Sequence, residues 1–143
     1  MIIEAMPDSE LRNKLRNFVY DIVGCCQEVH AEKGPWLTEY IYQECMQISL
    51  EERNIAFKKE FIFHPTYKGK RLESFLRVDF FIKDKVFVEC KAIESLGPHE
   101  RQQLTNYMRN AGVRIGILYN FAPVMAQCEK FYYDPDSNKI QYF

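Results

Sequence analysis

The sequence predicts a single α/β domain in which two helices precede a mixed β-sheet and a third helix interrupts the strands. In the first third of the chain, apolar residues recur every three or four positions, as on one face of a helix. From Phe57 onward, runs rich in Phe, Ile and Val alternate with turn signals, as in strands. The chain has 143 residues, 47% of them hydrophobic, which is enough for one core over residues 1–143.

Two helices open the predicted order. Apolar residues between positions 11 and 29 follow helical spacing, with Asp8 or Ser9 as the N-cap and a stop at Gly34. A second helix is expected over residues 37–53. Its expected buried residues are Ile41, Cys45, Ile48 and Leu50.

Strands make up most of the remainder. A turn at residues 67–70 separates the first two strands, Pro98 opens a helix at its first turn, and Gly112 ends that helix. The expected elements are, in order, strands over 57–66, 72–82 and 86–91, a helix over 98–110, a strand over 114–120 and a hairpin over 131–143.

Charge and cysteine content narrow the class of protein. The formal net charge of −1 excludes a protein that coats nucleic acid by charge alone. The five cysteines form no CxxC pair, so we expect reduced thiols in a cytoplasmic protein. We expect no signal peptide, because no basic segment followed by an apolar run opens the chain. The longest apolar stretch, residues 115–125, is too short to span a bilayer, so no membrane partner is expected.

The most informative pattern is Asp79 followed by Glu89-Cys90-Lys91. Because side chains alternate along a strand, Glu89 and Lys91 share one face. A three-residue turn at 83–85 would place Asp79 opposite Glu89. The same register would place Arg77 opposite Lys91. The residues expected on the other face of the earlier strand are Val78, Phe80 and Ile82.

Directly opposed carboxylates repel each other unless a cation lies between them. Mg²⁺ takes one or two carboxylates and completes its octahedron with water and phosphate oxygens, so Mg²⁺ or Mn²⁺ is the expected cofactor. Lys91 would orient a water or neutralise charge on the phosphate. The alternative is an ordinary surface ladder of ion pairs, since exposed strands also alternate Asp, Glu and Lys.

Several short motifs accompany this pattern. They are, in order, Val29-His30, Gly34-Pro35, Leu37-x-Glu39-x-x-Tyr42, Tyr67-Lys68-Gly69, Arg77-x-Asp79, Val88-Glu89-x-Lys91-Ala92, Gln103-x-x-x-Tyr107, Gly116 and Asn120-Phe121. The series resembles the small bacterial and archaeal GxxExxY proteins, a branch of the PD-(D/E)XK nuclease superfamily. The resemblance covers roughly residues 15 to 122.

This resemblance implies a restriction-endonuclease-like α-β-β-β-α-β core with an added N-terminal helix and a C-terminal hairpin. It implies that Glu39, Asp79 and Glu89 are metal ligands and that Lys91 is the catalytic lysine. Gln103 would reach the same site from the last core helix. The superfamily hydrolyses phosphodiesters with Mg²⁺, so the implied function is a metal-dependent nuclease with DNA as its substrate.

One position departs from the pattern, because Trp36 stands where GxxExxY begins with glycine. If the pattern needs glycine for a left-handed φ, Trp36 is strained. Otherwise its ring packs in the core or stacks on a base.

Candidate contacts to nucleic acid are basic. They are Lys58, Lys59, Lys68, Lys70 and Arg71 around the first hairpin, and Arg101, Arg109 and Arg114 near the last helix. Glu60 on the first strand is a candidate supplementary acid. The alternative functions are a non-catalytic module that binds nucleic acid or protein, and a structural subunit. A homodimer is an open option.

Overall fold

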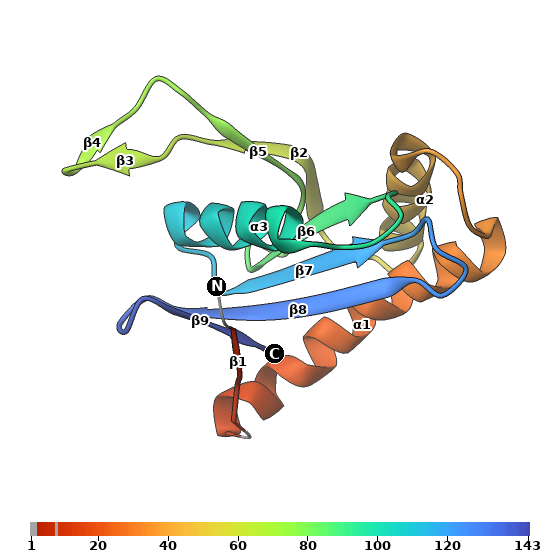
Figure 1. Cartoon of the computed structure of the whole chain (residues 1–143), viewed down its shortest axis with the longest axis horizontal. Coiled ribbons are helices and arrows are strands. Elements are labelled where there is room, and N and C mark those ends of the chain that lie inside the picture. The colour runs from red at the N-terminus through yellow and green to blue at the C-terminus, as the bar shows by residue number, and fades with distance from the viewer. Residues whose placement is uncertain (1–2, 8) are drawn as a thin grey trace.

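The computed structural model describes residues 3–7 and 9–143, which form a seven-stranded sheet with helices on both faces and a two-stranded ribbon that projects from one edge (Figure 1). The elements are β1 (Glu4–Ala5), α1 (Glu10–Lys33), α2 (Glu39–Glu52), β2 (Phe57–Phe63), β3 (Thr66–Tyr67), β4 (Lys70–Arg71), β5 (Leu76–Ile82), β6 (Val86–Lys91), α3 (Pro98–Ala111), β7 (Ile115–Asn120), β8 (Gln127–Asp134) and β9 (Lys139–Tyr142).

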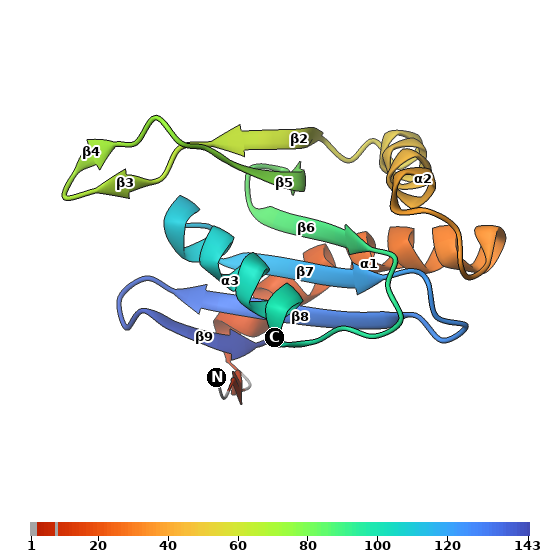
Figure 2. The same cartoon turned by 45° about the horizontal axis from the view of Figure 1, so that its top comes forward.

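The sheet is mixed, as predicted, and its strand order is β1-β9-β8-β7-β6-β5-β2. β6 and β7 pair in parallel across the α3 crossover, whereas β2, β5 and β6 are antiparallel neighbours. Helices α1 and α2 pack on one face and α3 on the other, which gives two core clusters (Figure 2). The helix, strand and crossover order is that of the restriction-endonuclease-like fold. Within the described residues no helix is long and apolar enough to cross a bilayer.

Helix α1 begins and ends at the predicted signals. The Ser9 side chain accepts the Arg12 backbone N–H at 3.1 Å, and Gly34 ends the helix with φ +77°. Asp8, the other predicted cap, lies outside the described residues.

The predicted buried face of α2 is wrong at Ile41 and Ile48, whereas Leu50 is buried and Cys45 is partly buried against the core, as predicted. Ile41 and Ile48 are exposed, and the buried residues are Tyr42, Gln43, Met46, Ser49 and Leu50. Hydrogen bonds as well as apolar packing hold Tyr42 inside. Its hydroxyl donates to Gly34 O at 2.7 Å and accepts the Leu37 N–H at 3.0 Å. These bonds fix the rotation of α2 about its axis.

Halfway along β2 and β5, the buried side chains of each strand change from one face of the sheet to the other. Phe80 and Ile82 pack with α1 and α2, whereas Val78 packs in the α3 cluster, so the prediction that all three share a face is wrong. The register passes through Lys59↔Phe80 and Phe61↔Val78, and Glu60 between them has φ +53°. A left-handed residue rotates the strand, so side chains beyond it leave on the opposite face.

The first hairpin continues as the β3–β4 ribbon, which Figure 1 shows extending away from the body. The predicted strand over 57–66 is interrupted after Phe63, and the one predicted over 72–82 begins only at Leu76. Between them Pro65 lacks an N–H, and its carbonyl accepts the Leu72 N–H at 2.9 Å. At the tip, Lys68 and Gly69 have φ +51° and +75°, as in a two-residue hairpin turn.

Candidate active site

Asp79 of β5 and Glu89 of β6 bind each other's strand at the point where the two strands separate. The Asp79 N–H donates to Glu89 Oε1 at 2.9 Å, and the Cys90 N–H donates to Asp79 Oδ2 at 2.8 Å. The last regular pair between these strands is Phe80↔Val88, so the carboxylates satisfy backbone donors that ladder carbonyls would otherwise bind. The two acidic groups are therefore adjacent and fixed by the main chain.

The predicted register is confirmed by Ile82↔Val86, which flank a turn at residues 83–85. Arg77 does not lie opposite Lys91, and that expectation is wrong. Arg77 pairs instead with Ile62 of β2, because β5 leaves β6 and continues along the edge strand.

Lys91 lies beside Glu89 and is held by α3. Its Nζ donates to Gln103 Oε1 at 2.8 Å and is 3.9 Å from Glu89 Oε2. The Gln103 amide in turn donates to the Tyr107 hydroxyl at 3.4 Å. The Lys91 side chain is 18% exposed, so its ammonium group is oriented by Gln103 rather than free in solvent. The structure thus brings Lys91 and Gln103 together, as the sequence predicts.

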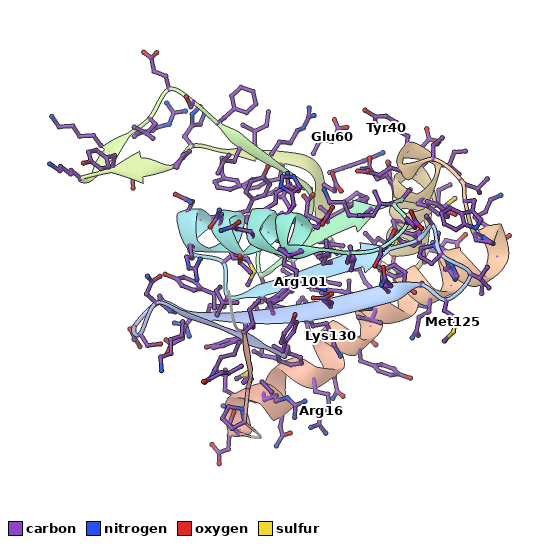
Figure 3. All side chains as sticks on the ribbon, viewed as in Figure 1. Arg16, Tyr40, Glu60, Arg101, Met125 and Lys130 are labelled. Atoms are coloured by element: carbon purple, nitrogen blue, oxygen red, sulfur yellow. The ribbon has the colours of Figure 1, made fainter. Side chains whose placement is uncertain are left out.

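Glu39 approaches from the first turn of α2. Its Oε1 accepts from Gln43 Nε2 at 3.2 Å. Glu39, Gln43 and Asp79 line an open cavity of about 160 Å³. The other lining residues are Tyr40, Glu60 and Arg77. Figure 3 shows Tyr40 and Glu60 on the same side of the molecule, one on α2 and one on β2.

Burial dominates the electrostatics of the acidic groups. It raises the pKa of Asp79 to about 6, helped by the charge of Glu39 and opposed by the Cys90 N–H and Lys91. It raises the pKa of Glu89 to about 8, helped by the charge of Asp79 and opposed by the Asp79 N–H and Lys91. Burial also raises the pKa of Glu39, which Lys91 and Gln43 oppose. Lys91 therefore acts on all three carboxylates, and the charge of Glu39 acts on Asp79 and Glu89, so these groups form one electrostatic site.

The donor set fits a divalent cation at Asp79 and Glu89. Oxygen ligands suit Mg²⁺, which takes one or two carboxylates and keeps several waters. The two carboxylates are close, buried and mutually repulsive, the situation that a bound cation relieves. Within residues 3–7 and 9–143, no three Asp, Glu, His or Cys side chains form a ready metal-binding group. Glu39 lies on the wall of the cavity that Asp79 also lines.

Three residues that line or support the site were not predicted as site residues from the sequence. Gln43 was visible one turn after Glu39, and its amide faces both Glu39 and Asp79. Arg77 lines the cavity only because β5 turns away from β6. Tyr107 follows Gln103 by one helical turn, which was a usable signal for its contact with that side chain.

A family model described as the PD-(D/E)XK nuclease superfamily matches residues 16–131. A solved structure titled "Crystal structure of SSO0001" aligns with 82% of this chain and 68% of its own, with 21% sequence identity and a TM-score of 0.45. No curated protein matches the sequence.

Proposed function

The chain belongs to the PD-(D/E)XK nuclease superfamily, and from that membership we propose that it hydrolyses phosphodiester bonds of DNA in the presence of Mg²⁺ or Mn²⁺. The observation that carries the proposal is the pair of adjacent carboxylates, Asp79 and Glu89, with Lys91 beside them. A surface ladder of ion pairs would leave such groups in solvent, whereas Glu89 is only 5% exposed. The GxxExxY branch is part of the same proposal.

Each residue has a distinct role in this proposal. Asp79 and Glu89 would hold the cation, and Glu39 would supply a further acidic ligand from the cavity that Asp79 also lines. A divalent ion bound there would polarise the phosphate and lower the pKa of a bound water. Lys91 would neutralise charge that develops on the phosphate. Gln103 is a positioning residue, because it fixes the Lys91 ammonium at 2.8 Å.

Local positive charge supports nucleic acid as the partner. Residues 64–75 of the ribbon contain Lys68, Lys70 and Arg71 against Glu73, which gives 3 − 1 = +2. Since the whole chain is −1, the remainder carries −3. These basic side chains are exposed, so the ribbon is suited to contact a phosphate backbone.

We also place the protein in the cytoplasm. All five cysteines are free, and Cys25, Cys26 and Cys90 are buried. Free thiols suit a reducing compartment.

The test is cleavage of single- and double-stranded DNA and RNA with Mg²⁺, Mn²⁺ or chelator. Glu89→Ala and Lys91→Ala are compared with wild type, and Glu44→Ala, an exposed glutamate of α2, is the matched control. Metal-dependent cleavage that both site variants lose and the control keeps supports the nuclease. Cleavage that survives in both site variants belongs to a contaminant and contradicts the proposal. Binding without cleavage favours the non-catalytic module.

A further inference from the structure

The segment between α1 and α2 holds an exposed tryptophan in a strained backbone conformation. Trp36 has φ +63°, and its side chain is 60% exposed, so it is neither relaxed nor packed. Strained residues persist only where the surroundings impose the conformation, and they cluster at functional sites. Of the three readings that the sequence left open for Trp36, strain is confirmed and core packing is wrong.

Hydrogen bonds on both sides impose this conformation. The Trp36 N–H donates to Ala122 O at 3.0 Å. The Tyr42 hydroxyl binds Gly34 and Leu37, the residues two before and one after the tryptophan. These hydrogen bonds hold residues 34–37 in place, so the exposed indole of Trp36 has a fixed position on the surface.

This segment is joined to the strand end that carries Lys91. The Phe121 N–H donates to Lys91 O at 2.9 Å, and its ring stacks on Tyr42 with centroids 4.7 Å apart. Ala122, the next residue, accepts the bond from Trp36. Trp36 thus lies at the end of β6 and β7 where the candidate active site is found.

A second exposed aromatic residue stands on the wall of the candidate site itself. Tyr40, in the first turn of α2, is 73% exposed and lines the cavity with Glu39 and Asp79. That cavity, of about 160 Å³, is also lined by Asp79, so a base attached to a phosphodiester held at Asp79 would lie close to the Tyr40 ring.

We propose that Trp36 and Tyr40 stack on unpaired bases of a single nucleic-acid strand whose phosphodiester lies at the Asp79–Glu89 site. Base–aromatic stacking tolerates any sequence, because every base has a π-face. The proposal rests on the proposed function, and it specifies a single-stranded or unpaired substrate for the same site.

The chain offers a direct probe, since Trp36 is its only tryptophan. Wild type in chelator is titrated with an oligothymidylate of about 12 nucleotides and with a blunt DNA duplex of equal length. Trp36 fluorescence is recorded, and affinity is measured by the anisotropy of labelled DNA. The variants are Trp36→Ala, Trp36→Phe and Tyr40→Ala. Met125→Ala is the control, because Met125 is 85% exposed and Figure 3 shows it well below Tyr40, in the segment between β7 and β8.

The single strand is expected to quench Trp36. Trp36→Ala should weaken single-strand binding between about fivefold and a hundredfold, with a smaller loss for Trp36→Phe, which keeps a ring. Duplex affinity and the Met125→Ala control should not change. Circular dichroism of each variant checks that the fold is intact.

Different results separate the two proposals. Single-strand binding with unchanged fluorescence, and equal affinity in Trp36→Ala, would overturn stacking and leave the nuclease proposal standing. Trp36 fluorescence could instead be quenched by raising the protein concentration without DNA, with self-association seen by sedimentation. That result would place Trp36 and Tyr40 in an interface between two copies of the chain, and it would likewise overturn stacking. Neither binding nor metal-dependent cleavage of any nucleic acid would refute both.

Discussion

Replacing Glu89 by glutamine should make the metal-free protein more stable, and increasingly so as pH rises. Burial, reinforced by the charge of Asp79, raises the pKa of Glu89 from 4.5 to about 8 in the folded chain. The pKa of Glu89 is higher in the folded chain than in the unfolded chain, so the protonated carboxyl contributes to the free energy of unfolding. This contribution is fully present below pH 4.5. It is lost as pH rises through about 8. Glutamine stays neutral over this range and suffers no such loss.

The magnitude follows from the shift. One pKa unit corresponds to about 1.36 kcal/mol, so wild type should lose on the order of 4 kcal/mol between pH 4.5 and pH 8 through this group. The gap in unfolding free energy between Glu89→Gln and wild type should therefore be near zero at the acid end. The gap should grow by about 1.4 kcal/mol per pH unit between pH 4.5 and about pH 8 and then level off.

Urea denaturation in chelator, followed by circular dichroism at several pH values, measures this gap. The matched control is Glu44→Gln, which changes an exposed glutamate of α2 and should show no such trend. Mg²⁺ at about 100 times its dissociation constant should then stabilise wild type by about 2.7 kcal/mol and Glu89→Gln far less. A gap that does not vary with pH, or equal stabilisation of both proteins by Mg²⁺, would refute the reasoning.

Further substitutions test three separate parts of the structure. Lys91→Ala should lower the kcat of metal-dependent cleavage by about 100-fold or more with little change in DNA affinity, and Gln103→Ala should lower kcat less. Steady-state kinetics measures kcat, and anisotropy measures DNA affinity. An unchanged kcat in Lys91→Ala would show that Lys91 takes no part in the chemistry. Trp36→Gly should be more stable than Trp36→Ala by about 1 kcal/mol in urea unfolding, since glycine adopts φ +63° without strain; the reverse order would contradict the strained backbone. Gly116→Ala should cost about 1–3 kcal/mol, because its Cβ would lie 2.5 Å from Met108 Sδ on α3; an unchanged melting temperature would contradict that packing.

Elements with strong local signals in the sequence have nearly the boundaries that were predicted for them. Strand β6 spans Val86–Lys91 as predicted, and α3 begins at Pro98 with Gly112 as its C-cap. These boundaries depend on proline, glycine and runs of apolar residues, whose effects act over a few positions. The N-terminal strand β1 had no such signal, since two residues pair in parallel with β9 from the far end of the chain.

The rotation of α2 needed the tertiary structure. Isoleucines at 41 and 48 suggested a buried face that the fold exposes, while a tyrosine and a glutamine lie inside. The Tyr42 hydroxyl finds its partners in the preceding loop, and its ring finds Phe121, 79 positions later in the chain. No periodicity in a single helix contains that information.

By itself, the sequence determined which residue types stand at the ends of the strands: the spacing of Asp79, Glu89 and Lys91 is fixed by the chain. Only the tertiary structure decided that the two carboxylates bind each other's strand, that Gln103 holds the lysine and that a cavity opens towards α2. The physical reason is that these contacts join side chains from separate elements, and the backbone pairing of β5 with β6 and the packing of α3 bring those elements together. Local sequence patterns act over a few positions and do not specify how such elements meet.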